Sequence, residues 1–180
     1  GPVLVGFTAD TITAGRWNAP TGASLSPAAV DRLLAGSLYF NVHSAALPGG
    51  EIRAQLLPAG TVLYFVDMAG LQEIPAVATT ASGRAAVTLN TITRIAQIYV
   101  NTTGVDDATA AHLHRGAAGS NGAVAVALTR DTAVPSRWFV QDSTLPQADF
   151  DALQAAGTYL NVHTPLNPVG EIRGQVIPAS

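Results

Sequence analysis

The sequence predicts an all-β fold, an antiparallel Greek-key β-sandwich or barrel with one short helix per repeat. Three observations predict it: short runs of β-branched and aromatic residues, turn-forming Gly, Pro, Asn and Asp between them, and an internal repeat of about 120 residues. Strands at this spacing are typical of sandwiches and Greek-key barrels. With 180 residues and 48% hydrophobic content, the chain can bury one good core or two small ones.

Short strands are expected through the last two thirds of the chain, because β-branched and aromatic runs alternate there with turn residues. They are expected at residues 62–66, 83–89, 95–101, 110–114, 123–128, 137–140, 158–163 and 171–177. Two helices interrupt this pattern. Ser26 and Pro27 predict the start of the first, because serine caps helices and proline fits their first turn. Residues 146–155 are its counterpart. Both segments carry apolar residues at helical spacing, Val30, Leu33 and Leu34 in the first and Phe150 and Leu153 in the second.

The end of the chain repeats a segment near its beginning. The NVH motif at 41–43 and the GEIR motif at 50–53 recur 120 residues later, at 161–163 and 170–173. Two upstream matches have an offset of 121, residues 1–8 with 122–129 and Arg16-Trp17 with Arg137-Trp138. We therefore expect residues 61–180 to form one complete repeat and residues 1–60 to form the C-terminal half of another.

Half of a β-module has unpaired strand edges and an uncovered apolar face, which a soluble monomer tolerates poorly. The missing strands could come from sequence preceding residue 1, from packing on the complete repeat, or from a partner chain by β-augmentation. Trp17 and Trp138 occupy equivalent places, so both are expected to act as core or edge anchors.

Composition narrows the classes of function. A net charge of −3 and nine scattered Arg provide no basic cluster for nucleic acid. The sequence has no apolar run long enough to span a membrane and no signal peptide, so a mature or trimmed chain is expected. The absence of Lys and Cys leaves a surface of small polar residues and a core without disulfides. We expect a secreted, periplasmic or cell-surface location.

Several ordered motifs resemble those of one known family. They are GLQEIP at 70–75, TASGR at 80–84, AHLHRGAAG at 111–119, NG at 121–122, NVHT at 161–164 and GEIRGQ at 170–175. Together they resemble the CHRD (chordin-type) domain over essentially all of residues 61–180, and the last motifs extend the resemblance to residues 1–60. The resemblance implies a module of exported proteins without a general enzymatic activity.

Three histidines form a candidate metal site. His112 and His114 are two residues apart on an expected strand, so they share a face, and His163 ends another expected strand. If the strands are neighbours, three imidazoles cluster and could bind copper or zinc. In the alternative interpretation, His112 and His114 bind loop carbonyls around residues 116–122, and His163 tethers the segment before Glu171.

A second group of residues predicts a structural network. It consists of Glu73, Glu171, Arg173, Gln175, Glu51, Arg53, Gln55 and His43. Glu171, Arg173 and Gln175 alternate along one strand and so share a face, and the same triplet stands at 51, 53 and 55. Arg173 is expected to bind a carboxylate such as Glu73 or Asp67 through both guanidinium arms.

These features favour a secreted or cell-surface module for protein binding or extracellular assembly, with a partner protein or further copies at the exposed sheet edges. The alternative is a protein that binds one copper or zinc ion through His112, His114 and His163. We expect no enzyme, because the chain has no nucleophile elbow, no phosphate-binding glycine loop and no closely spaced acidic pair.

Overall fold

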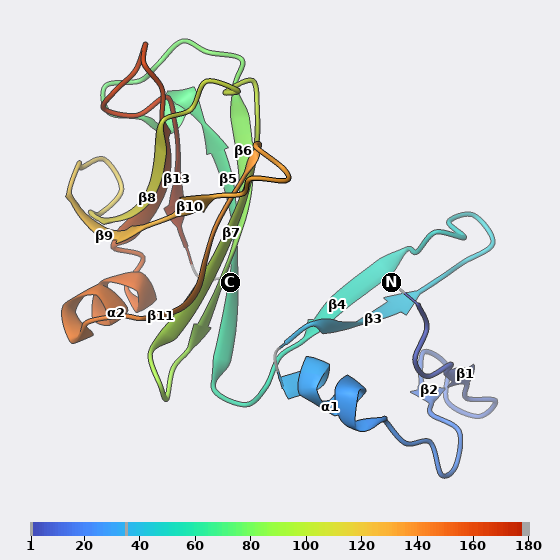
Figure 1. Ribbon diagram of the computed structural model, residues 1–180. Helices are drawn as coiled ribbons and strands as arrows, with labels where there is room; N and C mark the ends of the chain where they lie inside the picture. Colours follow the sequence, from blue (N-terminus) through green and yellow to red (C-terminus); the bar gives the residue numbers. More distant parts are fainter. Residues whose placement is uncertain (1, 35, 178–180) are drawn as a thin grey trace. The chain divides into compact units, whose positions relative to one another are not determined.

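The computed structural model describes residues 2–34 and 36–177, which divide into two compact units, Gly1–Ala59 and Gly60–Ser180 (Figure 1). The first unit contains β1 (Thr8–Ala9), β2 (Trp17–Asn18), α1 (Pro27–Leu34), β3 (Leu38–Val42) and β4 (Ile52–Leu56). The second contains β5 (Thr61–Ala69), the 3-10 helix η1 (Gly70–Gln72), β6 (Ser82–Asn90), β7 (Ile95–Thr103), β8 (Ala110–Arg115), β9 (Ala123–Ala127), β10 (Thr129–Arg130), β11 (Arg137–Thr144), α2 (Gln147–Gln154), β12 (Thr158–His163) and β13 (Ile172–Val176).

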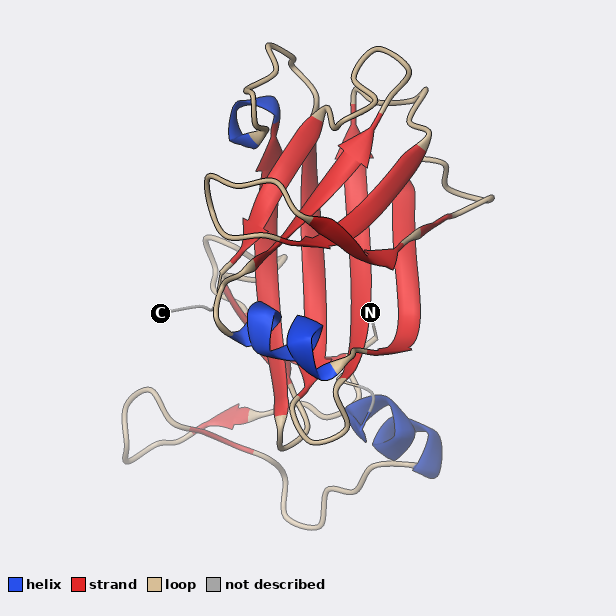
Figure 2. Cartoon of the chain, turned by 90° about the vertical axis from the view of Figure 1, so that its left-hand side faces the viewer, coloured by secondary structure: helices blue, strands red, loops and turns tan. Residues whose placement is uncertain are grey.

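The second unit is a nearly closed antiparallel barrel. Its nine strands have the order β10-β11-β7-β6-β5-β13-β12-β8-β9, and Figure 2 shows them side by side around one core. The two edge strands, β9 and β10, are separated in the chain by Leu128 alone, and the Leu128 amide donates a 2.9 Å hydrogen bond to the Ala111 carbonyl of β8, so the sheet nearly closes on itself. The predicted all-β Greek-key sandwich or barrel with short helices is therefore confirmed.

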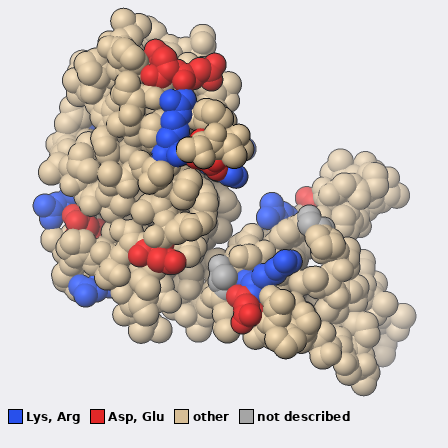
Figure 3. Space-filling model, in the orientation of Figure 1, with Lys and Arg blue, Asp and Glu red and all other residues tan. Residues whose placement is uncertain are grey.

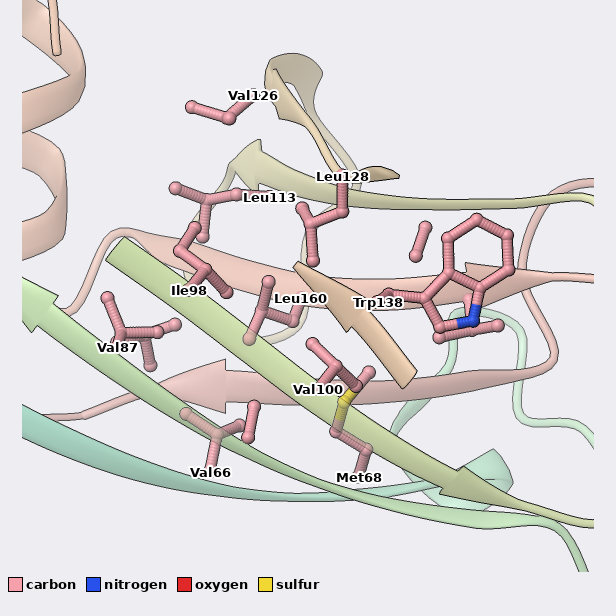
Figure 4. Packing of buried hydrophobic residues seen from close by; sticks show 14 of the residues in the cluster. Val66, Met68, Val87, Ile98, Val100, Leu113, Val126, Leu128, Trp138 and Leu160 are labelled. Carbon is pink, nitrogen blue, oxygen red and sulfur yellow. The ribbon is translucent and has the colours of Figure 1, made fainter. Parts of the chain in front are cut away.

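Alternation along the strands builds the core. In β6 and β7, every second residue is buried, and the inward side chains include Val87, Leu89, Ile98 and Val100. Figure 4 shows Val87, Ile98 and Val100 packed between the strands together with Trp138. Each fully buried side chain of this size stabilises the fold by roughly 1.5–3 kcal/mol, so this core supports the barrel without disulfides.

The first helix begins where its capping residues predicted. The Ser26 hydroxyl accepts a 3.3 Å hydrogen bond from the Ala29 amide at the start of α1. In α2, Phe150 and Leu153 are buried, which confirms the apolar face expected there. Over the part of the chain that the structure covers, neither helix has the length and apolar character needed to cross a membrane.

The first unit has the local structure of the end of the second. The pairs Thr8↔Asn18 and Ala9↔Trp17 of β1 and β2 correspond, 121 residues later, to Thr129↔Phe139 and Arg130↔Trp138 of β10 and β11. The five residue pairs of the β3–β4 hairpin have the same register as those of β12 and β13 at an offset of 120. Local sequence therefore determines these elements in both units.

The surroundings of the two hairpins differ. β12 and β13 lie between β8 and β5, whereas among the described residues β3 and β4 form a sheet of two strands. Phe40 and Ile52 are 44% and 64% exposed. Their counterparts Leu160 and Ile172 are fully buried.

The two tryptophans differ in the same way. Trp138 is buried in the core, as expected of an anchor. Trp17 is 47% exposed, so the expectation that it is a core anchor is wrong for this residue. The reason is that β2 has no neighbour in the described first unit other than β1, whereas β11 also pairs with β7.

Candidate metal centre

The register of β8 and β12 brings the three histidines together. β8 and β12 are antiparallel neighbours in which Asn161 pairs with His112 and Tyr159 pairs with His114. Their inward neighbours Leu113 and Leu160 are buried in the core, so the alternation directs the histidines to the outer face. His163, two residues beyond Asn161, joins them there, and the candidate nitrogens of the three rings all lie within 4.8 Å of one another.

Backbone carbonyls fix the orientation of two rings. His163 Nδ1 lies 3.1 Å from the Pro168 carbonyl, and His114 Nδ1 lies 2.9 Å from the Gly122 carbonyl. A carbonyl oxygen only accepts, so each Nδ1 carries the proton and each Nε2 presents a lone pair. For His114 and His163 this arrangement also agrees with the alternative interpretation, but His112 contacts His163 and not the loop carbonyl which that interpretation expects. A backbone carbonyl at the second ring nitrogen is the outer contact that metal-binding histidines commonly make.

The third ring completes the cluster. His112 Nδ1 lies 2.8 Å from His163 Nε2, and because His163 Nε2 is unprotonated, His112 is the donor of this hydrogen bond. Burial lowers the pKa of His112, and the neighbouring His163 and His114 lower it further. Burial also lowers the pKa of His163, against the opposing hydrogen bond to Pro168. Both rings therefore favour the neutral form that a metal ion requires.

One nitrogen of the cluster has no partner. His114 is 8% exposed, and its Nε2 is buried without a hydrogen-bond partner. The His114 ring is stacked on Tyr159, with centroids 4.9 Å apart and planes 8° apart, so its orientation is fixed. A buried lone pair without a donor costs free energy, and an ion bound at this point removes that cost.

Arg173 organises the loop beside the histidines. It is 2% exposed, lies 3.5 Å from the centre of the Tyr159 ring, and donates to Asn121 Oδ1 at 3.1 Å and the Ser120 carbonyl at 3.0 Å. It also donates to the Ala117 carbonyl and to Gln175. Arg173 thus holds residues 117–121 over the outer face, next to Gly122, whose carbonyl orients His114.

The expected partners of Arg173 are therefore wrong. Asp67 binds Arg84 at 2.8 Å, and no hydrogen bond or ion pair joins Arg173 to Glu73 among the described residues. Arg173 is surrounded by loop carbonyls and an amide, which take up its donors instead of a carboxylate. Gln175 donates to the carbonyls of Gly116 and Ala156 and belongs to the same network.

The two glutamates of the second unit, Glu73 and Glu171, lie in different environments. Glu73 is 5% exposed, and its Oε1 has no hydrogen-bond partner. Burial raises the pKa of Glu73 to about 7, although the charge of Arg173 and polar contacts from Asn161 and the Ile74 amide act in the opposite direction. Glu171 accepts hydrogen bonds from Thr164, Thr79 and Asn167 at the loop between β12 and β13.

The first unit carries the corresponding half of this site. His43 Nδ1 lies 2.8 Å from the Pro48 carbonyl, as His163 lies beside Pro168. Gln55 donates to the carbonyls of Gly36 and Leu38, and Arg53 donates to Gln55 at 3.4 Å. Glu51 and Arg53 are exposed, unlike Arg173. The described first unit has no counterpart of His112 or His114 beside His43.

Sequence reasoning missed two contributors. Tyr159 stacks between Arg173 and His114, and its hydroxyl accepts a hydrogen bond from the Gly122 amide at 3.1 Å. The alternation that places His163 and Asn161 on one face extends to Tyr159 and could have identified it. Asn121, which binds Arg173 and the Ile74 carbonyl, lies in a loop, and no local pattern could have placed it.

Comparison with known proteins assigns the chain to a family. The family model of the CHRD domain matches residues 1–56 and 64–176, and these ranges include the three histidines and the Arg173 network. No curated protein and no solved structure matches the chain. The protein is therefore a member of the CHRD domain family.

Proposed function

We propose that the protein binds one copper or zinc ion through His112, His114 and His163. The observation that carries this proposal is the buried Nε2 of His114, which has no partner and belongs to a cluster of three imidazoles. Neutral imidazoles are good ligands for both metals. His112 is the most exposed of the three and gives the ion a path from solvent.

An ion must take the place of the hydrogen bond between two of the rings. The 2.8 Å between His112 Nδ1 and His163 Nε2 is the length of that hydrogen bond, whereas two nitrogens bound to one ion at about 2.05 Å lie about 2.9–3.3 Å apart. The His112 Nδ1 proton then moves to His112 Nε2, which frees Nδ1 to bind, and the nitrogens of the three rings, which lie within 4.8 Å of one another, draw together around the ion. Three protein ligands leave a further position for water or another donor.

Metal titration tests this site. We expect isothermal calorimetry with copper(II) or zinc to give one ion per chain. His114→Ala should weaken binding by about 100-fold or more, because losing a ligand costs more than losing an outer contact, which costs 10–100-fold. His43→Ala is the matched control, because His43 has the same carbonyl contact without the other two rings, and it should bind like the original chain. Equal losses in both variants, or no uptake by the original chain, would contradict the site.

The rest of the proposal concerns the setting of this site. We infer a binding role and not a catalytic one, in a secreted, periplasmic or cell-surface protein without a nucleic-acid partner. The surface without Lys supports the location. Figure 3 shows few charged side chains on the visible face, in small groups of both signs, which gives nucleic acid no basic surface.

A second proposed function is protein binding or assembly through the first unit. We propose that residues 1–60 are the C-terminal half of a CHRD repeat and that residues 61–180 are a complete one. Support comes from the matching registers of the β3–β4 and β12–β13 hairpins and from the exposure of Phe40 and Ile52. Open strand edges and apolar side chains of this kind are typical of surfaces that accept another β-segment.

A further inference from the structure

We propose that the β3–β4 hairpin is the docking site for the N-terminal half of another CHRD repeat, a segment of the kind of residues 61–121, and that docking completes a second metal centre at His43. The docking step rests on the proposed half repeat, and the second centre rests on the proposed metal function. The occupant is defined by its chemistry: a strand that carries His-x-His, accompanied by a strand equivalent to β5.

His43 is already oriented as a ligand. Its Nδ1 lies 2.8 Å from the Pro48 carbonyl and carries the proton. Its Nε2 lies 3.3 Å from Nδ2 of the Asn41 side chain. Because Nδ2 can only donate a hydrogen bond, His43 Nε2 is the acceptor and presents a lone pair. His163 has the same tautomer for the same reason. The first unit thus presents one ligand of a site that has three in the second unit.

The backbone specifies how the occupant pairs. On β12, Asn161 pairs with His112 and Tyr159 pairs with His114. The corresponding residues of β3 are Asn41 and Tyr39, and among the described residues the edge of β3 away from β4 has no strand. A strand added in the β8 register therefore places its two histidines opposite these residues and beside His43. Antiparallel addition also forms backbone hydrogen bonds along this edge of β3.

The inner face of the hairpin supplies the driving force. Phe40 and Ile52 are 44% and 64% exposed, whereas Leu160 and Ile172 have 1% and 0% exposure under the strands of the second unit. Burying apolar side chains of this size stabilises a complex, because it removes them from water. Trp17 is 47% exposed where Trp138 is buried, so the first unit has a third large apolar side chain that is less covered than its counterpart.

One position constrains the fit. A Cβ on Gly174 would lie 2.5 Å from Val66 Cγ1 and 2.6 Å from the Asp67 carbonyl oxygen of β5. The equivalent residue of β4 is Ala54. A strand identical to β5 must therefore shift to pair with β4, and Ala54→Gly should remove that obstacle.

The test uses the full chain with a second copy of residues 61–121 fused before Gly1, because Gly122 aligns with Gly1. We expect the amides of β3 to exchange hydrogen about 100-fold or more slowly in the fused protein than in the original chain. Copper(II) uptake should rise from one ion per chain to two. Ala54→Gly should increase the protection further.

Variants of the fused protein separate docking from metal binding. His43→Ala, or replacement of both histidines in the added copy of β8, should return uptake to one ion and keep the amide protection. Unprotected β3 amides in the fused protein, with and without Ala54→Gly, would overturn the proposal. The proposal would also be overturned if the β3 amides of the original chain exchanged more slowly as the protein concentration was raised. In that case the occupant would be a second copy of the chain. Absence of copper from both proteins contradicts both metal centres but leaves the amide test of docking intact.

Discussion

Arg173→Ala is expected to lower the free energy of unfolding of the second unit by about 2–3 kcal/mol, the usual cost of removing a buried side chain together with its hydrogen-bond network. The side chain is 2% exposed and donates to Asn121, Ser120, Ala117 and Gln175. Its loss leaves these acceptors without their donor and removes the cation from the Tyr159 ring. Urea denaturation measures the change, followed by Trp138 fluorescence in a Trp17→Phe background.

The chain contains its own control for this prediction. Arg53 occupies the equivalent strand position, lies 3.9 Å from the centre of the Tyr39 ring and is exposed. Arg53→Ala should change stability by no more than about 0.5 kcal/mol, as expected of a surface position. Arg173→Lys should recover only part of the loss, because an ammonium group cannot reproduce the planar fork of a guanidinium. If Arg53→Ala and Arg173→Ala lowered the free energy of unfolding by similar amounts, the hydrogen bonds of Arg173 would not contribute the expected stability.

The strands and the local faces could be predicted from sequence, because both follow from short-range alternation. A period of two places His112 and His114 on one face before any strand neighbour is known. The same period separates Val87 and Leu89 from the outer residues of β6. Turn residues then predicted where most strands begin and end, to within a few residues.

The partners of buried polar groups could not be predicted, because they depend on the paths of distant loops. Arg173 binds carbonyls at 117 and 120, which come from the loop after β8, more than 50 residues away. A carboxylate was the expected partner because charged residues can be read from a sequence. The direction in which a loop carbonyl points cannot. Trp17 shows the same limit, since its exposure depends on neighbouring strands and not on its own sequence context.

The environment of Glu73 predicts an unusual pH dependence of stability. Its pKa is raised from an ordinary 4.5 to about 7 by burial, so the folded state binds the proton more tightly than the unfolded state. The stabilisation is fully present below about pH 4.5 and is lost as the pH rises through about 7. A shift of this size corresponds to about 3 kcal/mol of stability between these limits.

Glu73→Gln tests this prediction by removing the titrating group at nearly constant shape. The variant should lack the decline between pH 4.5 and 7 and should be more stable than the original protein at pH 8. All other ionisable groups are common to both proteins, so their contribution cancels in the difference between the two urea denaturation curves. Equal pH slopes for the two proteins would show that Glu73 has the same proton affinity in the folded and unfolded states.

Glu171 is the matched control of opposite sign. Hydrogen bonds from Thr164, Thr79 and Asn167 lower its pKa against a smaller opposing effect of burial, because they stabilise the charged carboxylate. Its contribution to stability is therefore present at neutral pH and is lost as the pH falls through its folded-state pKa. Glu171→Gln should destabilise the protein at pH 7 and have little effect in acid. Two glutamates beside the same hairpin thus respond to pH in opposite directions, because one carboxylate has donors around it and the other has burial without enough of them.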